Sequence, residues 1–265
     1  MSTRPSRLPL ILLLLLPFAV HAQRRGEYGR YFGDPNEFYM PRSYAGNVKY
    51  DGRFTFARIM YRGTGQGTGW AHDYPRAESH FMRIIRQITT VRPFVEAGPV
   101  VGGNILALDD PELFKYPVAY LSEPGGWLPN DKEVEGLRNY LKKGGFLIID
   151  DFDGGSMDRD WLQFVGQMQR VLPQARIGEV PQGHAIFDSF FKIDFAKLVA
   201  YRTGGTPGYF GVFEDNDPRK RVMVIINFNQ DIGDYWEWSD RGFNVVPSNE
   251  AYKLGVNYLV YALTH

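Results

Sequence analysis

From residue 53 onward, apolar segments of strand length alternate with amphipathic segments of helix length. Residues 54–61, 116–121 and 146–149 are the strand-like runs, and 75–88 and 130–143 place apolar side chains at helical spacing between them. Strands that alternate with helices are typical of a parallel sheet covered on both faces. The pattern predicts an α/β fold, a three-layer sandwich with a mostly parallel central sheet.

The helix expected after Asn130 has the clearest boundaries. Asn130 and Glu133 have the spacing of a capping box, and Gly144 stands where helices commonly end in a left-handed residue. The same kinds of signal predict the remaining elements: a helix between Ser156 and Pro173, strands at 208–214 and 221–228, and a final, nearly all-apolar helix at 248–263.

The first 22 residues have the pattern of a secretory signal peptide. Arg4 and Arg7 precede an apolar run at 8–18, and cleavage is expected after Ala22. The run is roughly half of the ~20 residues that span a bilayer, although an uncleaved anchor stays the alternative. We expect an exported protein, periplasmic or secreted, with no transmembrane segment in the mature chain.

Domain organisation follows from the same pattern. Residues 23–52 are rich in Gly, Tyr, Arg, Asn and Pro without a period, and are expected to form an irregular N-terminal arm. The alternating pattern begins at residue 53 and continues to the end of the chain. We therefore expect one α/β domain over 53–265.

Composition narrows the function classes. Thirty basic and thirty acidic residues argue against a nucleic-acid surface, so no nucleic-acid partner is expected. The absence of cysteine excludes disulfides, a lipoprotein anchor and thiol catalysis. No motif for a cofactor is present, and none is predicted.

Candidate site residues follow the predicted strands, because ligands of open α/β sheets bind at the carboxyl ends of strands. The strand at 146–149 leads directly into Asp150 and Asp151, with Asp153 close behind. The other strand ends supply Glu123 as a further acid and these candidates for ligand binding: Gly65, Gly67, Gly125, Gly126, Asp231 and Asp234.

The glycine-rich loop at 63–69 does not match a known phosphate-binding motif. No Lys-Ser or Lys-Thr pair follows it, and Thr68 stands where the dinucleotide fingerprint requires glycine. Gly65 and Gly67 can still offer backbone N–H groups to an anion before the next helix. The alternative is a flexible surface loop.

Three interpretations of the acid cluster Asp150, Asp151 and Asp153 stay open. The carboxylates can ligate a hard cation such as calcium or magnesium, although the EF-hand spacing is absent. They can act as general acid and base in hydrolysis. They can also cap the following helix and hold turns.

Histidines near aspartates are a second candidate feature. His184 precedes Asp188 in an expected loop, and His72 is followed by Asp73 just after the glycine-rich loop. Either histidine can pair with a carboxylate or bind a ligand, and a structural role is the alternative. We take His184 as a candidate catalytic partner of Asp150, Asp151 or Glu123.

Several segments, in order, resemble the bacterial family called domain of unknown function 4159. They are 54–61, 108–114, 144–151, 184–187, 231–234 and 254–264. The resemblance implies a fold similar to class I glutamine amidotransferases and other flavodoxin-like domains. Asp150-Asp151-Phe152 would then occupy the turn that carries the amidotransferase cysteine, which excludes amidotransferase activity here. The family supplies no established reaction.

Two functions from different classes follow from these observations. The first is an exported, non-catalytic α/β domain of the cell envelope that binds a small ligand or an envelope partner. The alternative is a hydrolase that acts on a glycan or another envelope polymer through the acid cluster.

Overall fold

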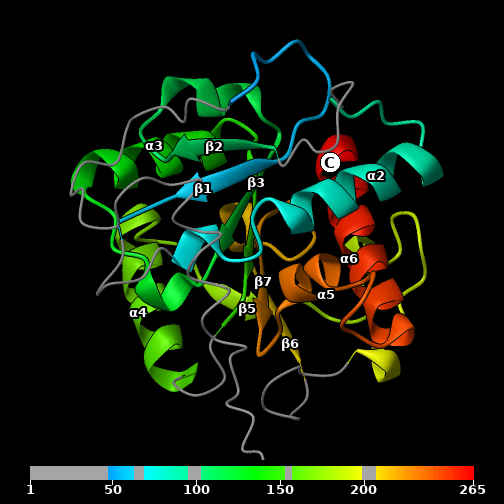
Figure 1. The fold of residues 1–265 in the computed structure, drawn as a ribbon. Helices are drawn as coiled ribbons and strands as arrows, with labels where there is room; N and C mark the ends of the chain where they lie inside the picture. The colour runs from blue at the N-terminus through cyan, green and yellow to red at the C-terminus, as the bar shows by residue number, and fades with distance from the viewer. Residues whose placement is uncertain (1–46, 63–68, 95–102, 153–156, 199–206) are drawn as a thin grey trace, which may run out of the picture. The chain divides into compact units, whose positions relative to one another are not determined.

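A computed structural model describes residues 47–62, 69–94, 103–152, 157–198 and 207–265 (Figure 1). The expected signal peptide and most of the expected arm lie outside the described residues. The described residues belong to one compact unit, residues 41–265. Its strands are β1 (Ala57–Met60), β2 (Asn104–Ala107), β3 (Val118–Ser122), β4 (Phe146–Asp150), β5 (Ile177–Glu179), β6 (Gly208–Phe213) and β7 (Val222–Phe228).

The α-helices of the described part lie between these strands or follow the last of them. They are α2 (Arg76–Ile88), α3 (Asp131–Lys142), α4 (Met157–Val171), α5 (Ile232–Glu237) and α6 (Val245–Thr264). Among the described residues, no helix combines the length and the apolar character needed to cross a membrane.

The strands form one sheet of order β2-β1-β3-β4-β7-β6-β5. The strands from β2 to β7 in this order are parallel, and β6 runs antiparallel to β7. β5 pairs antiparallel with β6 and therefore runs in the direction of the parallel strands. The parallel part has the flavodoxin-like order, in which the chain reverses its direction of winding between β1 and β3. The predicted α/β fold and its mostly parallel sheet are confirmed.

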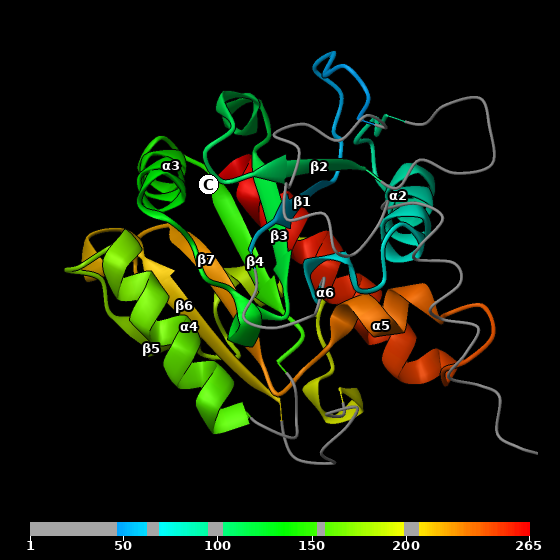
Figure 2. The same cartoon turned by 60° about the vertical axis from the view of Figure 1, so that its left-hand side comes forward.

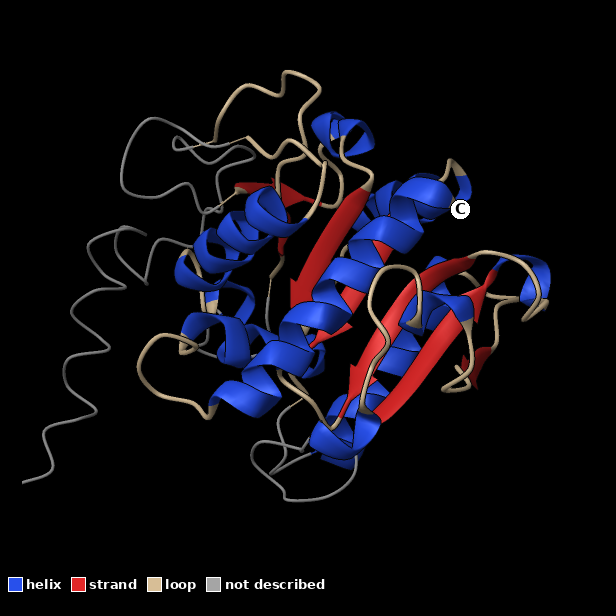
Figure 3. Cartoon of the chain, turned by 90° about the vertical axis from the view of Figure 1, so that its right-hand side faces the viewer, coloured by secondary structure: helices blue, strands red, loops and turns tan. Residues whose placement is uncertain are grey.

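Helices cover both faces of the sheet, giving three layers (Figure 2). α3 and α4 lie on one face, and α2, α5 and α6 lie on the other. Figure 3 shows helices of the second layer in front of the strands. On this side Trp236 of α5 is 1 % exposed and stacks on Phe81 of α2, with 4.6 Å between ring centroids. Aromatic stacking therefore joins two helices of this layer.

Local signals explain the element boundaries. Asn130 caps α3, and its side chain accepts from the Glu133 amide while the Glu133 side chain accepts from the Asn130 amide. Gly144, after α3, has φ of 106°, the conformation that glycine adopts without strain. Three short elements were not predicted: β2, β5 and α5. They are too brief for periodicity to identify. β2 and β5 are strands by their pairing with β1 and β6, and α5 packs against α2.

Two helical glycines give a matched test of the packing. Gly136 of α3 faces a backbone oxygen, since a Cβ there would lie 2.0 Å from Leu108 O, whereas a Cβ on Gly166 of α4 would meet nothing within 4 Å. Gly166→Ala should raise the free energy of unfolding by about 0.5–1 kcal/mol through helix propensity. Gly136→Ala should lower it by about 1–3 kcal/mol through the clash.

Urea denaturation of the two variants beside the wild-type protein measures both changes. Equal stabilisation by the two substitutions would contradict the described packing of α3.

Candidate metal centre

Acidic residues converge where the parallel strands end. Ser122 at the end of β3 pairs in register with Asp150 at the end of β4. The Asp151 amide, one residue further, donates to the Gln230 carbonyl at 3.1 Å and so joins the segments that follow β4 and β7. Asp231 follows β7 after two intervening residues, Asn229 and Gln230. These contacts bring acids from two strand ends to one edge of the sheet.

Asp150 is held by donors on every side. Tyr120 Oη donates to its Oδ2 at 2.6 Å, the Gly233 amide to Oδ2 at 3.0 Å, and Asn227 Nδ2 to Oδ1 at 3.0 Å. Tyr258 Oη in turn donates to Asn227 Oδ1 at 2.8 Å. Burial raises the pKa of Asp150 to about 7, against the lowering effect of these hydrogen bonds. With its oxygens engaged in this network, Asp150 acts as a positioning group that ties β3, β7 and α5 together.

The loop after β1 reaches the same edge because a buried arginine fixes it. Arg58 of β1 is 1 % exposed and forms an ion pair with Glu78 of α2. Its Nη1 donates to the carbonyls of Trp70 at 3.0 Å and His72 at 2.8 Å. The loop that carries His72 and Asp73 is thus anchored from inside the core.

Asp73 is the least compensated of the buried acids. It is 1 % exposed, and neither carboxylate oxygen has a hydrogen-bond partner among the described residues. One ligand atom each from Asp73, Asp151 and Asp231 lies within 4.8 Å of the others. Burial first, and then the charges of Asp234 and Asp151, raise the pKa of Asp73 well above its ordinary value. We call Asp73, Asp151 and Asp231 the inner triad.

Asp231 shares this environment. Its Oδ1 accepts from the Asp234 amide at 2.8 Å, while its Oδ2 is buried without a hydrogen-bond partner in the described part of the chain. Burial, followed by the charges of Asp151 and Asp73, raises its pKa well above the ordinary value. Two of the three inner acids therefore direct unpaired oxygens into a negatively charged interior.

A second group of ligands stands at the rim. His72 Nδ1 lies 3.1 Å from Glu123 Oε1 and 3.5 Å from Asp151 Oδ2, and one ligand atom from each of the three falls within 4.8 Å of the others. Asp151 first, and Glu123 as well, raise the pKa of His72 against the lowering effect of burial. We call His72, Glu123 and Asp151 the outer triad.

The backbone around the acids is unusual. Asp73, Glu123, Asp151 and Asn229 all have φ between 49° and 63°, a region that residues other than glycine rarely occupy. Gly233 approaches so closely that a Cβ there would lie 2.6 Å from Asp73 Oδ2. Strained residues of this kind cluster at functional sites, where the surrounding structure holds them.

The donor set fits a divalent cation. Carboxylate oxygens are the preferred ligands of Ca²⁺, Mg²⁺ and Mn²⁺. Asp73, Asp234 and Glu237 form a further group of ligand atoms within 4.8 Å, which continues the inner triad through Asp73. The position agrees with topology, since the loops after β1 and β3 lie at the point where the winding direction reverses.

Comparison with protein families now identifies the family. The sequence profile described as domain of unknown function 4159 (DUF4159) matches residues 55–263. The chain belongs to the DUF4159 family. A search of curated proteins found no match to the chain. In this DUF4159 protein the turn after β4 carries Asp151, and the sequence contains no cysteine.

The structure brings together most of the acids expected from sequence. Asp151, Glu123, Asp231 and Asp234 lie at the candidate metal centre, and Asp150 lies beneath it in the hydrogen-bond network. Gly65, Gly67 and Asp153 lie outside the described residues.

The two glycines after β3 have a packing role in the described structure. A Cβ on Gly125 would lie 2.3 Å from the Asp160 side chain of α4, so the glycine lets the α4 side chain approach. A Cβ on Gly126 would lie 3.8 Å from Tyr61 Oη, an ordinary contact. Neither position adds a ligand to the triads.

His184 is not a partner of the acid cluster, which corrects the expected catalytic pairing. Its ring packs 5.9 Å from that of Phe213, a residue paired with Val222 at the start of β7, whereas Asp231 follows the end of β7. His184 Nδ1 accepts from the Ile186 amide at 3.1 Å and caps a short helical turn. The length of β7 separates the histidine from the acids.

Sequence reasoning noted His72 and Asp73 but did not place them with the acids. The signal was their position, since they follow the loop after the first strand, whose carboxyl end shares an edge with the ends of β3 and β4.

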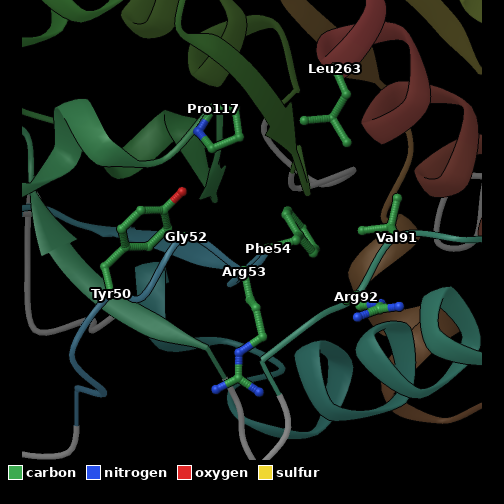
Figure 4. A pocket seen from close by; sticks show the side chains of 8 residues that line it. All are labelled: Tyr50, Gly52, Arg53, Phe54, Val91, Arg92, Pro117 and Leu263. Carbon is green, nitrogen blue, oxygen red and sulfur yellow. The ribbon is translucent and has the colours of Figure 1, made fainter.

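A separate pocket, lined in part by Phe54, Pro117 and Leu263, is shown in Figure 4. Phe54 and Pro117 precede β1 and β3, so this pocket lies at the other end of the sheet.

The raised pKa of Asp150 predicts a pH dependence of stability. Its folded-state pKa of about 7 exceeds the ordinary value of 3.8, so the folded protein holds this proton more tightly than the unfolded chain. The resulting stabilisation is fully present below about pH 4 and is lost as the pH rises through about 7. Asp150→Asn cannot ionise and removes this contribution.

Urea denaturation with a chelator at pH values from 5 to 8 checks the prediction. The free energy of unfolding of the wild-type protein should fall with pH relative to that of Asp150→Asn. Parallel curves for the two proteins would contradict it.

Proposed function

We propose that this protein is an exported α/β domain that binds a divalent cation through the inner triad and uses that cation to hold an oxyanionic ligand. The observation that carries the proposal is Asp73. Its carboxylate is fully buried, has no hydrogen-bond partner among the described residues, and faces Asp151 and Asp231.

The energetics of burial favour a cation at this place. An unpaired buried carboxylate costs on the order of several kcal/mol, and a second and third acid nearby add repulsion. Arg58, the buried cation nearby, is already paired with Glu78. A divalent ion would offset most of the negative charge of the triad and would satisfy the open oxygens of Asp73 and Asp231.

The access side of the site supports a ligand-holding role. The inner acids are buried, whereas the side chains of His72 and Glu123 are 30 % and 36 % exposed. A cation with three protein ligands keeps further coordination positions, and those positions would face the solvent-accessible rim. The proposal includes export of the protein, which the signal-peptide pattern of residues 1–22 predicts.

Asp73→Asn tests the proposal, with Asp188→Asn as the matched control. Asparagine keeps the shape and tolerates the positive φ of residue 73, but removes the charge. We expect the wild-type protein to gain roughly 2.7 kcal/mol at a Ca²⁺, Mg²⁺ or Mn²⁺ concentration 100-fold above Kd. The variant should be more stable than wild type in chelator, and it should show no such gain in stability when Ca²⁺ or Mg²⁺ is added.

Thermal unfolding in chelator and in each cation measures both effects. Asp188 is exposed and lies in the segment of His184, so Asp188→Asn should keep the wild-type response. A wild-type melting temperature that none of the three cations raises would show that the proposed site is wrong.

A hydrolase that acts on an envelope polymer is the second candidate function. The favouring observation is His72 beside Asp151, because a histidine with a raised pKa is placed to protonate a leaving group. In this form of the hypothesis His72 takes the role that His184 was expected to have. Cation-bound water would be the nucleophile.

Turnover of peptidoglycan fragments and chromogenic glycosides in the presence of Mg²⁺ or Mn²⁺ tests this function. Asp151→Asn should lower the rate by about 100-fold or more while circular dichroism shows an intact fold. Equal rates for the variant and the wild-type protein would remove Asp151 from the chemistry, and no turnover by the wild-type protein would leave cation-dependent binding as the function.

A further inference from the structure

We infer that the centre holds two cations, with the outer triad of His72, Glu123 and Asp151 as a second metal position that shares Asp151 with the inner one. This inference rests on the proposed function, because it places the second ion beside the first. The outer position would take a transition-metal ion such as Mn²⁺ or Zn²⁺.

The geometry of the outer triad is that of ligands around a common point. His72 Nδ1 is itself a buried atom and makes no aligned hydrogen bond with any described residue, although Glu123 Oε1 is only 3.1 Å away. The nitrogen thus lies within 3.5 Å of an oxygen from each of the two carboxylates, Glu123 and Asp151. An imidazole nitrogen and carboxylate oxygens around one point are a metal-binding set.

Glu123 is held close to His72 by its surroundings. A Cβ on Gly69 would lie 2.1 Å from Glu123 Oε2, so the missing side chain at Gly69 makes room for the carboxylate. Glu123 itself has φ of 49°, which turns the chain sharply after β3. The side chain is thereby directed across the edge of the sheet toward the loop of His72.

Asp151 is placed to serve both positions. It belongs to the inner and the outer triad, and a carboxylate has two oxygens that can each bind a different ion. Ser122 Oγ donates to its Oδ2 at 3.2 Å and fixes the orientation of the group. Bridging ligands of this kind hold the two ions of binuclear centres about 3.5–4 Å apart.

The two positions differ in chemistry and in access. The inner triad consists of carboxylates that are 1 % to 4 % exposed, a set for hard cations. The outer triad adds an imidazole, which favours transition metals, and two of its side chains are 30 % and 36 % exposed. The outer ion should therefore exchange faster and prefer Mn²⁺ or Zn²⁺ to Ca²⁺ or Mg²⁺.

Counting bound Mn²⁺ on the full chain tests the inference. Isothermal titration calorimetry with metal analysis should give two Mn²⁺ per wild-type chain and two for the control Asp188→Asn. Glu123→Gln and Asp73→Asn should each retain one, and Asp151→Asn should retain none. Circular dichroism establishes that each variant is folded, and His72→Gln replaces Glu123→Gln if that variant does not fold.

The outcomes separate the inference from the proposed function. If the wild-type chain binds one Mn²⁺, and this ion is retained by Glu123→Gln but lost from Asp73→Asn, then the second metal position is wrong and the inner site stands. Two Mn²⁺ that survive both Glu123→Gln and His72→Gln would also overturn it. No bound Mn²⁺ on the wild-type chain would overturn the two-ion centre. The proposed function would be overturned as well only if Ca²⁺ and Mg²⁺ also failed to raise the melting temperature.

Discussion

The constraint on which the rest of this structure depends is the burial of negative charge at the carboxyl edge of the sheet. Each buried carboxylate must be compensated, because its desolvation costs on the order of several kcal/mol. Glu78 is compensated by Arg58, and Asp150 by donors from Tyr120, Asn227 and Gly233. Asp73 has neither kind of compensation among the described residues. An ion is the remaining means of neutralising it in the charged state.

Arg58 links this electrostatic problem to the fold. Its guanidinium lies 4.8 Å from the centre of the Tyr120 ring, and Tyr120 is a donor to Asp150. The same guanidinium donates hydrogen bonds to the carbonyls of Trp70 and His72, in the loop that brings His72 and Asp73 to the edge of the sheet. One buried cation in β1 thus positions acids that come from separate parts of the chain. The arrangement is built into the core rather than left to surface loops.

The sequence was sufficient for the fold and for part of the site. Long periodic segments identified the parallel strands and their helices, and the rule of strand ends located Asp151 and Asp231. His184 and His72 show where this reasoning stops. Both stand near an aspartate in a non-repetitive segment, and they differ only in which end of the sheet they reach. That difference depends on long-range contacts, such as those of Arg58, which no local pattern contains.

The two adjacent aspartates at the end of β4, Asp150 and Asp151, have different surroundings. Successive side chains of a strand point to opposite faces, but the chain leaves the strand at Asp151 with φ of 61°. Asp150 therefore stays in the hydrogen-bond network, while Asp151 turns outward between the inner and outer triads. The resemblance described above implies that this turn is the counterpart of the one that carries the thiol nucleophile in amidotransferases, and in this chain the turn carries an acid. A carboxylate among carboxylates is a poor nucleophile and a good metal ligand, which agrees with the proposed cation site.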